Sequence, residues 1–246
     1  MKNTKIDKVA SNLVKAFVQN KIIAPIPLKF TKSMKNAESL RRLCESKIKQ
    51  PIIGFKAGGT SIKMLKKWGI KKPFYAAVYK KNLLKSGKKV KINPYTLGAE
   101  LEVGYFIKKS FFDSKGAITA NNIHKYISYR LPSIEIAGYR QRKKGLKYLG
   151  DLCSDFGANI KFLIGKKIKH TKTNSNNLKT HLSNKKNKQF VDGNTNTVFV
   201  NPLNSLKFGF LLMTNGIKFL PFVHYLICSY DALFDVQFYL LSQWSI

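Results

Sequence analysis

Acidic residues are scarce in this chain. Only 12 residues are Asp or Glu, against 45 Lys or Arg, which gives a net charge of +33. The basic residues are 40 lysines, spread along the sequence, and five arginines, whereas nucleic-acid surfaces rely on arginine forks and a concentrated patch. The charge therefore indicates a general bias towards lysine. A nucleic-acid partner stays open as an alternative but is not favoured.

Cysteine and histidine are also few. The three cysteines lie far apart, no Cys-x-x-Cys occurs, and His170, His181 and His224 do not have the spacing of metal ligands. A disulfide scaffold and a structural zinc site are both excluded by this pattern. Unpaired cysteines indicate a reducing compartment, so we expect a cytoplasmic location.

Long apolar runs are missing as well. The N-terminus has no uninterrupted hydrophobic core of the kind that a signal peptide needs. The C-terminal part is apolar, but Lys218, Pro221, Asp231 and Asp235 keep its runs below the roughly 18 residues of a spanning helix. We expect neither a signal peptide nor a membrane partner.

The chain has enough apolar residues, 44 % of 246, to build a substantial core. Near-helical spacing of apolar residues predicts helices over 5–20 and 36–48, and Pro51 ends the second. This pattern divides the chain into an N-terminal helical segment, residues 1–50, and a β-rich domain, residues 51–246, whose last 30 or so residues are divergent.

Within the second part the sequence predicts several further elements. Short apolar runs predict strands at 52–60, 73–79, 97–106, 131–140, 159–164 and 198–200. Helices are expected over 61–68, 119–129 and 201–214. The Asn- and Lys-rich residues 166–188 read as a loop or a weak hairpin, and residues 191–194 as a turn.

Two glutamates stand out inside an apolar run, LGAELEVGY, at residues 97–105. In a strand Glu100 and Glu102 project to the same face, where like charges repel unless a metal ion or a shared proton is present. An isolated Glu-x-Glu pair favours a solvated strand face. A third glutamate, Glu135, is embedded between aliphatic residues in LPSIEIAGYR, and Lys56 precedes the glycine pair of IIGFKAGGT. With so few acidic residues in the chain, three buried-type glutamates favour a functional site.

The order of several segments resembles the 2-keto-4-pentenoate hydratase group of the fumarylacetoacetate hydrolase superfamily, which also includes 2-oxohept-3-ene-1,7-dioate hydratase and 4-oxalocrotonate decarboxylase. The resemblance covers roughly residues 9–215 and rests on IIAPIPL, NAESL, IIGFKAGGTS, GIKKPFYAAVY, AELEVGYFI, LPSIEIAGYR, LCSDFGANIKFLIG and NPLNSLKFG.

This resemblance implies a mixed α/β fold with a rolled or barrel-like β core, flanking helices and an N-terminal helical segment. It implies that Glu100, Glu102 and Glu135 bind one Mg²⁺ or Mn²⁺, and that Lys56 and Asp155 are catalytic. Three carboxylates with water suit these hard cations. Members of the group are commonly homo-oligomers, so self-association is expected.

The chain departs from the family pattern at three places. Relatives usually carry a polar residue followed by aromatic-Gly where this chain has Phe74-Tyr75-Ala76. The family's Asp-Asn-Ala-Ser segment reads Asp155-Phe156-Gly157-Ala158. The family's C-terminal Gly-Asp-x-x-x-Thr-Gly segment has no counterpart, and the nearest stretch is residues 223–229.

The expected function is a metal-dependent hydratase of aromatic-compound catabolism, which adds water to a short 2-hydroxy-2,4-dienoate or unsaturated 2-oxo acid. Lys56 would bind the substrate carboxylate, or relay protons if burial lowers its pKa. Two alternatives stay open: a 4-oxalocrotonate-type decarboxylase, and a catalytically impaired relative whose basic surface binds polyanions.

Overall fold

The structure is a computed structural model, and it describes residues 5–111, 113–114, 116–119, 121–171, 177–184, 189–197, 203 and 225–229. In this part of the chain no helix has both the length and the apolar character that crossing a membrane requires. The strand expected at 198–200 and, except for Leu203, the helix expected at 201–214 lie outside the described residues.

Two helices begin the chain. α1 (Lys5–Gln19) buries Ala10, Leu13 and Phe17, whose three- and four-residue spacing places them on one face. α2 (Met34–Lys47) follows a 3₁₀ turn, η1 (Leu28–Phe30), and begins one turn earlier than the sequence suggests. Its N-cap is Ser33, whose hydroxyl accepts a hydrogen bond from the backbone N–H of Asn36.

An eight-stranded sheet forms the centre of the molecule. Seven of its strands lie in the order β2-β1-β10-β4-β5-β6-β3, and β7 pairs with β5. The strands are β1 (Ile52–Gly58), β2 (Phe74–Tyr79), β3 (Leu83–Lys85), β4 (Thr96–Ile107), β5 (Ile127–Gly138), β6 (Asn159–Ile164), β7 (Ile168–Lys169) and β10 (Tyr225–Ser229). Among the described residues no pairing joins the two end strands, β2 and β3, so the barrel-like closure stays a prediction.

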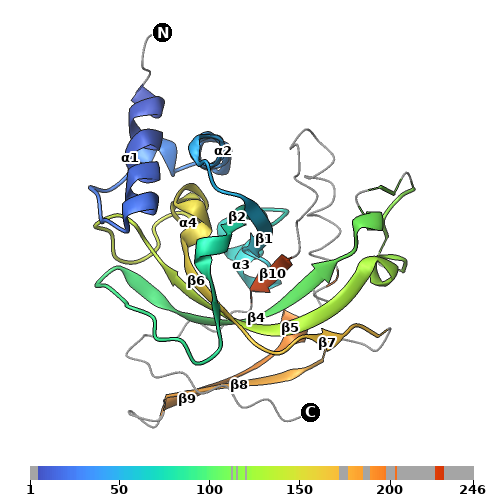
Figure 1. Cartoon of the computed structure of the whole chain (residues 1–246). Helices are drawn as coiled ribbons and strands as arrows, with labels where there is room; N and C mark the ends of the chain where they lie inside the picture. The colour runs from blue at the N-terminus through green and yellow to red at the C-terminus, as the bar shows by residue number, and fades with distance from the viewer. Residues whose placement is uncertain are drawn as a thin grey trace.

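Helices and a hairpin flank this sheet. α1, α2 and α4 (Leu149–Ser154) lie on one side of it, and the hairpin of β8 (Lys179–Asn184) and β9 (Gln189–Asn194) lies on the other (Figure 1). α3 (Ile62–Trp68) begins at Ser61 and ends at Gly69, which adopts the left-handed conformation common after a helix. The remaining 3₁₀ turns are η2 (Lys80–Asn82), η3 (Lys109–Phe111), η4 (Ile123–Tyr126), η5 (Phe156–Ala158) and η6 (Thr195–Thr197).

Three expectations need correction or completion. The helix predicted over 119–129 is wrong: only the single turn η4 forms, and the chain enters β5 at Ile127. The turn predicted at 191–194 is part of β9, which pairs with β8, so the weak-hairpin alternative is the one found. Residues 225–229, part of the divergent stretch, form a strand between β1 and β4.

The main core fills the space between the helices and the sheet. It includes Leu13 and Phe17 of α1, Leu40 of α2, Phe55 of β1 and Tyr105 of β4, each nearly or fully buried. Glu45 of α2 extends this packing, because its Oε1 accepts the N–H of Ala77 at 2.9 Å on the edge strand β2. The helices therefore satisfy part of the sheet edge and hold it next to the site described below.

Candidate metal centre

The three glutamates singled out in the sequence converge on one face of the sheet. Glu100 and Glu102 are two residues apart on β4, and Glu135 on β5 lies directly opposite Glu100 in the antiparallel register. One carboxylate oxygen from each lies within 4.8 Å of the others. Three of the five glutamates in the chain thus meet at one point.

This cluster is shielded from solvent. Glu102 and Glu135 have no exposed surface, and Glu100 is half-buried and lines a cavity of about 380 Å³. We call this space the glutamate cavity. Its other lining residues come from β1, α3, β2 and the α4–η5 segment, and they are Lys56, Gly58, Gly59, Thr60, Lys63, Met64, Lys67, Phe74, Leu97, Ala137, Gly145, Leu146, Leu149, Leu152, Gly157 and Ala158.

Lys56 lies beside the carboxylates, as the sequence predicts. Its Nζ is 2.8 Å and 2.6 Å from the two carboxylate oxygens of Glu135, and it donates a third hydrogen bond to the carbonyl of Gly157 at 3.2 Å. Burial lowers the pKa of Lys56, but the carboxylates of Glu135, Glu100 and Glu102 outweigh burial and raise it above its ordinary value. Lys56 is therefore a cation in this arrangement, and a proton relay that requires a lowered pKa is not what the geometry supports.

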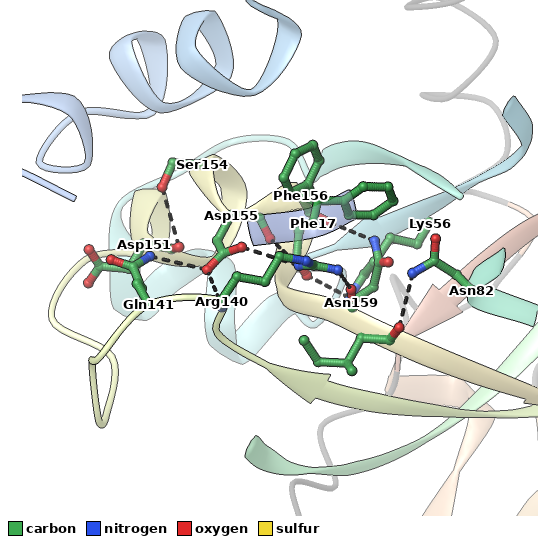
Figure 2. Close-up of polar contacts among 12 residues, drawn as sticks. Phe17, Lys56, Asn82, Arg140, Gln141, Asp151, Ser154, Asp155, Phe156 and Asn159 are labelled. Carbon is green, nitrogen blue, oxygen red and sulfur yellow. Dashed lines mark hydrogen bonds and ion pairs between the residues drawn. The ribbon is translucent and has the colours of Figure 1, made fainter. Parts of the chain in front are cut away.

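Asp155 occupies a different position from the one expected of a catalytic residue. It is fully buried and is absent from the residues that line the glutamate cavity. Its Oδ2 accepts the backbone N–H of Arg140 at 2.7 Å and the Gln141 side chain at 3.2 Å, and its Oδ1 accepts the Arg140 guanidinium at 3.2 Å (Figure 2). Asp155 thus holds the chain in place and does not reach the cavity.

What Asp155 holds is an unusual turn. Phe156, Gly157 and Ala158 have φ angles of 53°, 70° and 56°, all in the left-handed region that residues other than glycine seldom adopt. The Asn159 side chain donates to the Phe156 carbonyl at 2.5 Å, and the Arg140 guanidinium also donates to the carbonyl of Asn159. This turn presents the Gly157 carbonyl to Lys56, so Asp155 positions Lys56 through the backbone.

Gly157 and Arg140 are the contributors that the sequence did not reveal. A Cβ on Gly157 would lie 2.7 Å from the Cβ of Ala76 and 3.3 Å from the Cδ of Lys56, so only glycine fits there. A side chain is also excluded at Gly58, because a Cβ there would lie 2.4 Å from the Phe74 ring. The only sequence feature that pointed to the Gly157 contact was the departure from the family pattern at residues 74–76 and 156–158.

The donor set fits a hard divalent cation. Carboxylate oxygens are the ligands that Mg²⁺, Mn²⁺ and Ca²⁺ prefer, and three carboxylates, two of them fully buried, leave net negative charge beside one ammonium. A carboxylate has about four lone-pair sites, so Glu135 can serve Lys56 and a metal ion together. No histidine or cysteine belongs to this cluster among the described residues, which disfavours zinc.

No known family model matches this sequence, and no curated protein matches it either. Solved structures do match. Two are 4-oxalocrotonate decarboxylase from Pseudomonas putida G7, one complexed with magnesium and adipate (TM-score 0.72) and one with calcium and acetate (TM-score 0.70). In each, sequence identity is 16 % over 93 % of this chain and 88 % of that chain.

A third similar structure comes from Yersinia pestis CO92 and is assigned to the fumarylacetoacetate hydrolase family. Its TM-score is 0.52, with 12 % identity over 77 % of this chain and 87 % of that chain. At such identities the likeness concerns the fold and not the function. The chain therefore has a mixed α/β fold like that of the 4-oxalocrotonate decarboxylase structures.

Proposed function

We propose that the protein is a divalent-metal-dependent lyase that acts on a short unsaturated 2-oxo acid through an enolate. The observation that carries this proposal is the convergence of Glu100, Glu102 and Glu135 beside Lys56. The complexes of the similar decarboxylase with magnesium and calcium support a hard cation at such a site. We propose Mg²⁺ or Mn²⁺ for this chain.

Different residues of the glutamate cavity would bind the charged and the apolar parts of an anionic substrate. A cation held by the three glutamates supplies positive charge next to the substrate's 2-oxygen, where negative charge develops. Lys56 adds a fixed ammonium at the cavity wall, and Lys63 and Lys67 are exposed at its rim, where they attract carboxylates. Phe74, Leu149 and Leu152 provide an apolar surface for the carbon chain and exclude water.

Hydration is the reaction that the sequence resemblance implies, and decarboxylation is a second candidate with its own support. Hydration needs a group that orients or activates water, yet the wall carries Phe74 where relatives usually have a polar residue. When an unsaturated 2-oxo diacid loses its distal carboxylate as CO₂, the electron pair of the broken bond moves through the double bond onto the 2-oxygen. This step needs stabilisation of the enolate charge but no activated water. The fold likeness to the decarboxylase structures agrees with this second candidate.

An assay with two substrates separates these reactions. The purified protein is mixed with 2-hydroxypenta-2,4-dienoate or with 4-oxalocrotonate, with Mg²⁺, Mn²⁺ or excess chelator, and the decay of dienol absorbance and the NMR spectrum of the product are recorded. A hydroxylated 2-oxo acid from the first substrate identifies the hydratase, and release of CO₂ from the second identifies the decarboxylase.

Two results would reject the proposal as a whole. One is a rate equal to that without protein for both substrates, although the metal-loaded protein is folded. The other is a rate that does not change in Glu100→Ala. The first result would favour the alternative of an impaired relative with a polyanion-binding surface, and RNA or heparin affinity that falls steeply with salt would support it.

A further inference from the structure

A second cavity, larger than the first, lies on the other side of the Asp155–Asn159 turn. Its volume is about 570 Å³, within the range of small-molecule pockets. We call it the lysine cavity. Its walls come from the end of α1, the η2–β3 segment and the loop after it, the end of β5, and β6, and its cationic lining residues are Lys21, Lys81, Lys89, Lys91, Arg140 and Lys161.

A chain with 40 lysines places lysines around any surface cavity, so their number carries no argument. Burial and partners are more informative. Lys81 and Lys161 are both partly buried, and their side chains meet backbone carbonyls: Lys81 donates to the carbonyl of Phe17, and Lys161 donates to the carbonyl of Lys81 at 2.6 Å. The ammonium of Lys81 also lies 3.7 Å from the centre of the Phe17 ring.

No acidic residue faces these two lysines among the residues that the structure describes. The lining of the lysine cavity contains neither Asp nor Glu, and neither lysine takes part in an ion pair there. Arg140, the third cation, is paired with the buried Asp155. The cavity thus holds two half-buried charges that only neutral groups stabilise.

The electrostatics of these lysines show that the arrangement is unfavourable by itself. Burial, together with repulsion by Arg140 and Lys161, lowers the pKa of Lys81 to about 8. Burial and repulsion by Arg140 also lower the pKa of Lys161. An anion between these cations would relieve the repulsion and raise the pKa of both lysines.

We propose that the lysine cavity binds a small phosphomonoester, of the sugar phosphate class, with its phosphate between Lys81 and Lys161 and its organic part in the rest of the cavity. A phosphomonoester dianion matches two lysine charges. Its oxygens can accept hydrogen bonds from the N–H groups of each ammonium that do not donate to a backbone carbonyl. The volume exceeds what inorganic phosphate needs and leaves room for the organic part.

Calorimetric titration tests this proposal with glucose 6-phosphate, inorganic phosphate and glucose as probes, at pH 7 and about 0.15 M salt, where non-specific attraction to a basic surface is screened. We expect saturable 1:1 binding of glucose 6-phosphate, at least about tenfold weaker binding of inorganic phosphate, and none of glucose. Equal affinity for the two phosphates would overturn the contribution of the organic part, and no binding of glucose 6-phosphate would overturn the site.

Matched variants distinguish this cavity from general charge. Lys81→Gln/Lys161→Gln should weaken glucose 6-phosphate binding at least about tenfold, whereas Lys35→Gln/Lys125→Gln, which removes the same charge from exposed positions, should change it less than about twofold. Equal losses in the two variants would overturn the proposal, because they would show that only net charge matters.

Because Lys81 and Lys161 also bond to backbone, a second pair of variants avoids a folding defect. Lys89→Glu/Lys91→Glu reverses two exposed charges at the rim of the lysine cavity, and Lys35→Glu/Lys125→Glu is its control. The rim variant should bind glucose 6-phosphate at least about fivefold more weakly than the control, with unchanged thermal unfolding. Affinities that agree within twofold would contradict the proposal.

Discussion

The two cavities of this protein treat buried charge in opposite ways. In the glutamate cavity, Lys56 and Glu135 have 4 % and 0 % exposed side chains and neutralise each other at 2.6 Å. In the lysine cavity, Lys81 and Lys161 face backbone carbonyls, the Phe17 ring and other cations in the described part of the chain. Removing one partner of a balanced buried pair lowers the stability of the fold, whereas removing the charge of an unbalanced buried group relieves an unfavourable interaction. Substitutions that remove a charge should therefore change the free energy of unfolding in opposite directions in the two cavities.

The largest effect on stability is expected from Glu135→Gln. It leaves the buried Lys56 ammonium without its closest counter-charge, which should lower the free energy of unfolding by about 3 kcal/mol in urea titrations. The double variant Lys56→Met/Glu135→Gln should recover part of this loss, because the buried ammonium is gone, although Glu100 and Glu102 keep their charges. Glu38→Gln on α2 is the control for loss of a carboxylate, and a loss below about 1 kcal/mol in Glu135→Gln would contradict the buried pair.

The next effect concerns metal affinity. Glu102→Gln should weaken Mg²⁺ and Mn²⁺ binding at least about 100-fold in calorimetric titrations, because it removes one charged ligand of three. The ion pair with Lys56 is made by Glu135, so the loss of Glu102 tests the cluster separately from that pair. Affinity that stays within threefold of that of Glu38→Gln would show that these carboxylates do not bind the metal.

The wall between the cavities gives a third test. Gly157→Ala should cost about 1–3 kcal/mol, because the new methyl group would lie 2.7 Å from the Cβ of Ala76. Ala76→Gly/Gly157→Ala removes the clash and should recover part of the loss. A double-mutant cycle measures the coupling, expected at about 1 kcal/mol. Additive losses would mean that the two residues do not touch.

The smallest effect is a pH dependence in the lysine cavity. The folded pKa of Lys81 is about 8, and that of an unfolded lysine is about 10.4. Between these values the unfolded chain binds the extra proton, so stability should rise with pH relative to Lys81→Gln, and the penalty for charging Lys81 is fully present below pH 8. The charged groups that face Lys81 are Arg140 and Lys161.

Thermal unfolding of wild type and Lys81→Gln between pH 7 and 10 measures this difference. Saturating glucose 6-phosphate should make the unfolding temperature of wild type depend less on pH, since a bound anion keeps Lys81 protonated. Parallel curves for the two proteins without ligand would show that Lys81 titrates normally and would remove the contrast between the two cavities.

The glutamate cluster was predictable from the sequence in part because it follows from short-range rules. Period-two alternation places Glu100 and Glu102 on one face, and an apolar setting marks Glu135. The facing of Glu135 and Glu100 depends on the register of β4 and β5, for which the family resemblance supplied the expectation and the structure supplied the pairing.

Other features depend on contacts between distant segments. Residues 119–122 carry the signals of a helix start, but Asn122 bonds back to the Thr119 N–H and Ala117 carbonyl and closes a turn instead. Neither the role of Asp155 as a positioning residue nor the lysine cavity could be read from spacing, since five segments up to 145 residues apart in sequence build that cavity's wall, from Ala16 to Lys161.

The contact between Ala76 and Gly157 also limits the order in which this chain can change. The family pattern has glycine and alanine at the positions where this chain has alanine and glycine, and only one methyl group fits between the two backbones. An exchange through Ala-Ala would meet the 2.7 Å clash, so the accessible route passes through Gly-Gly. The residues at positions 76 and 157, far apart in the sequence, are thus coupled by packing, and a change at one decides what fits at the other.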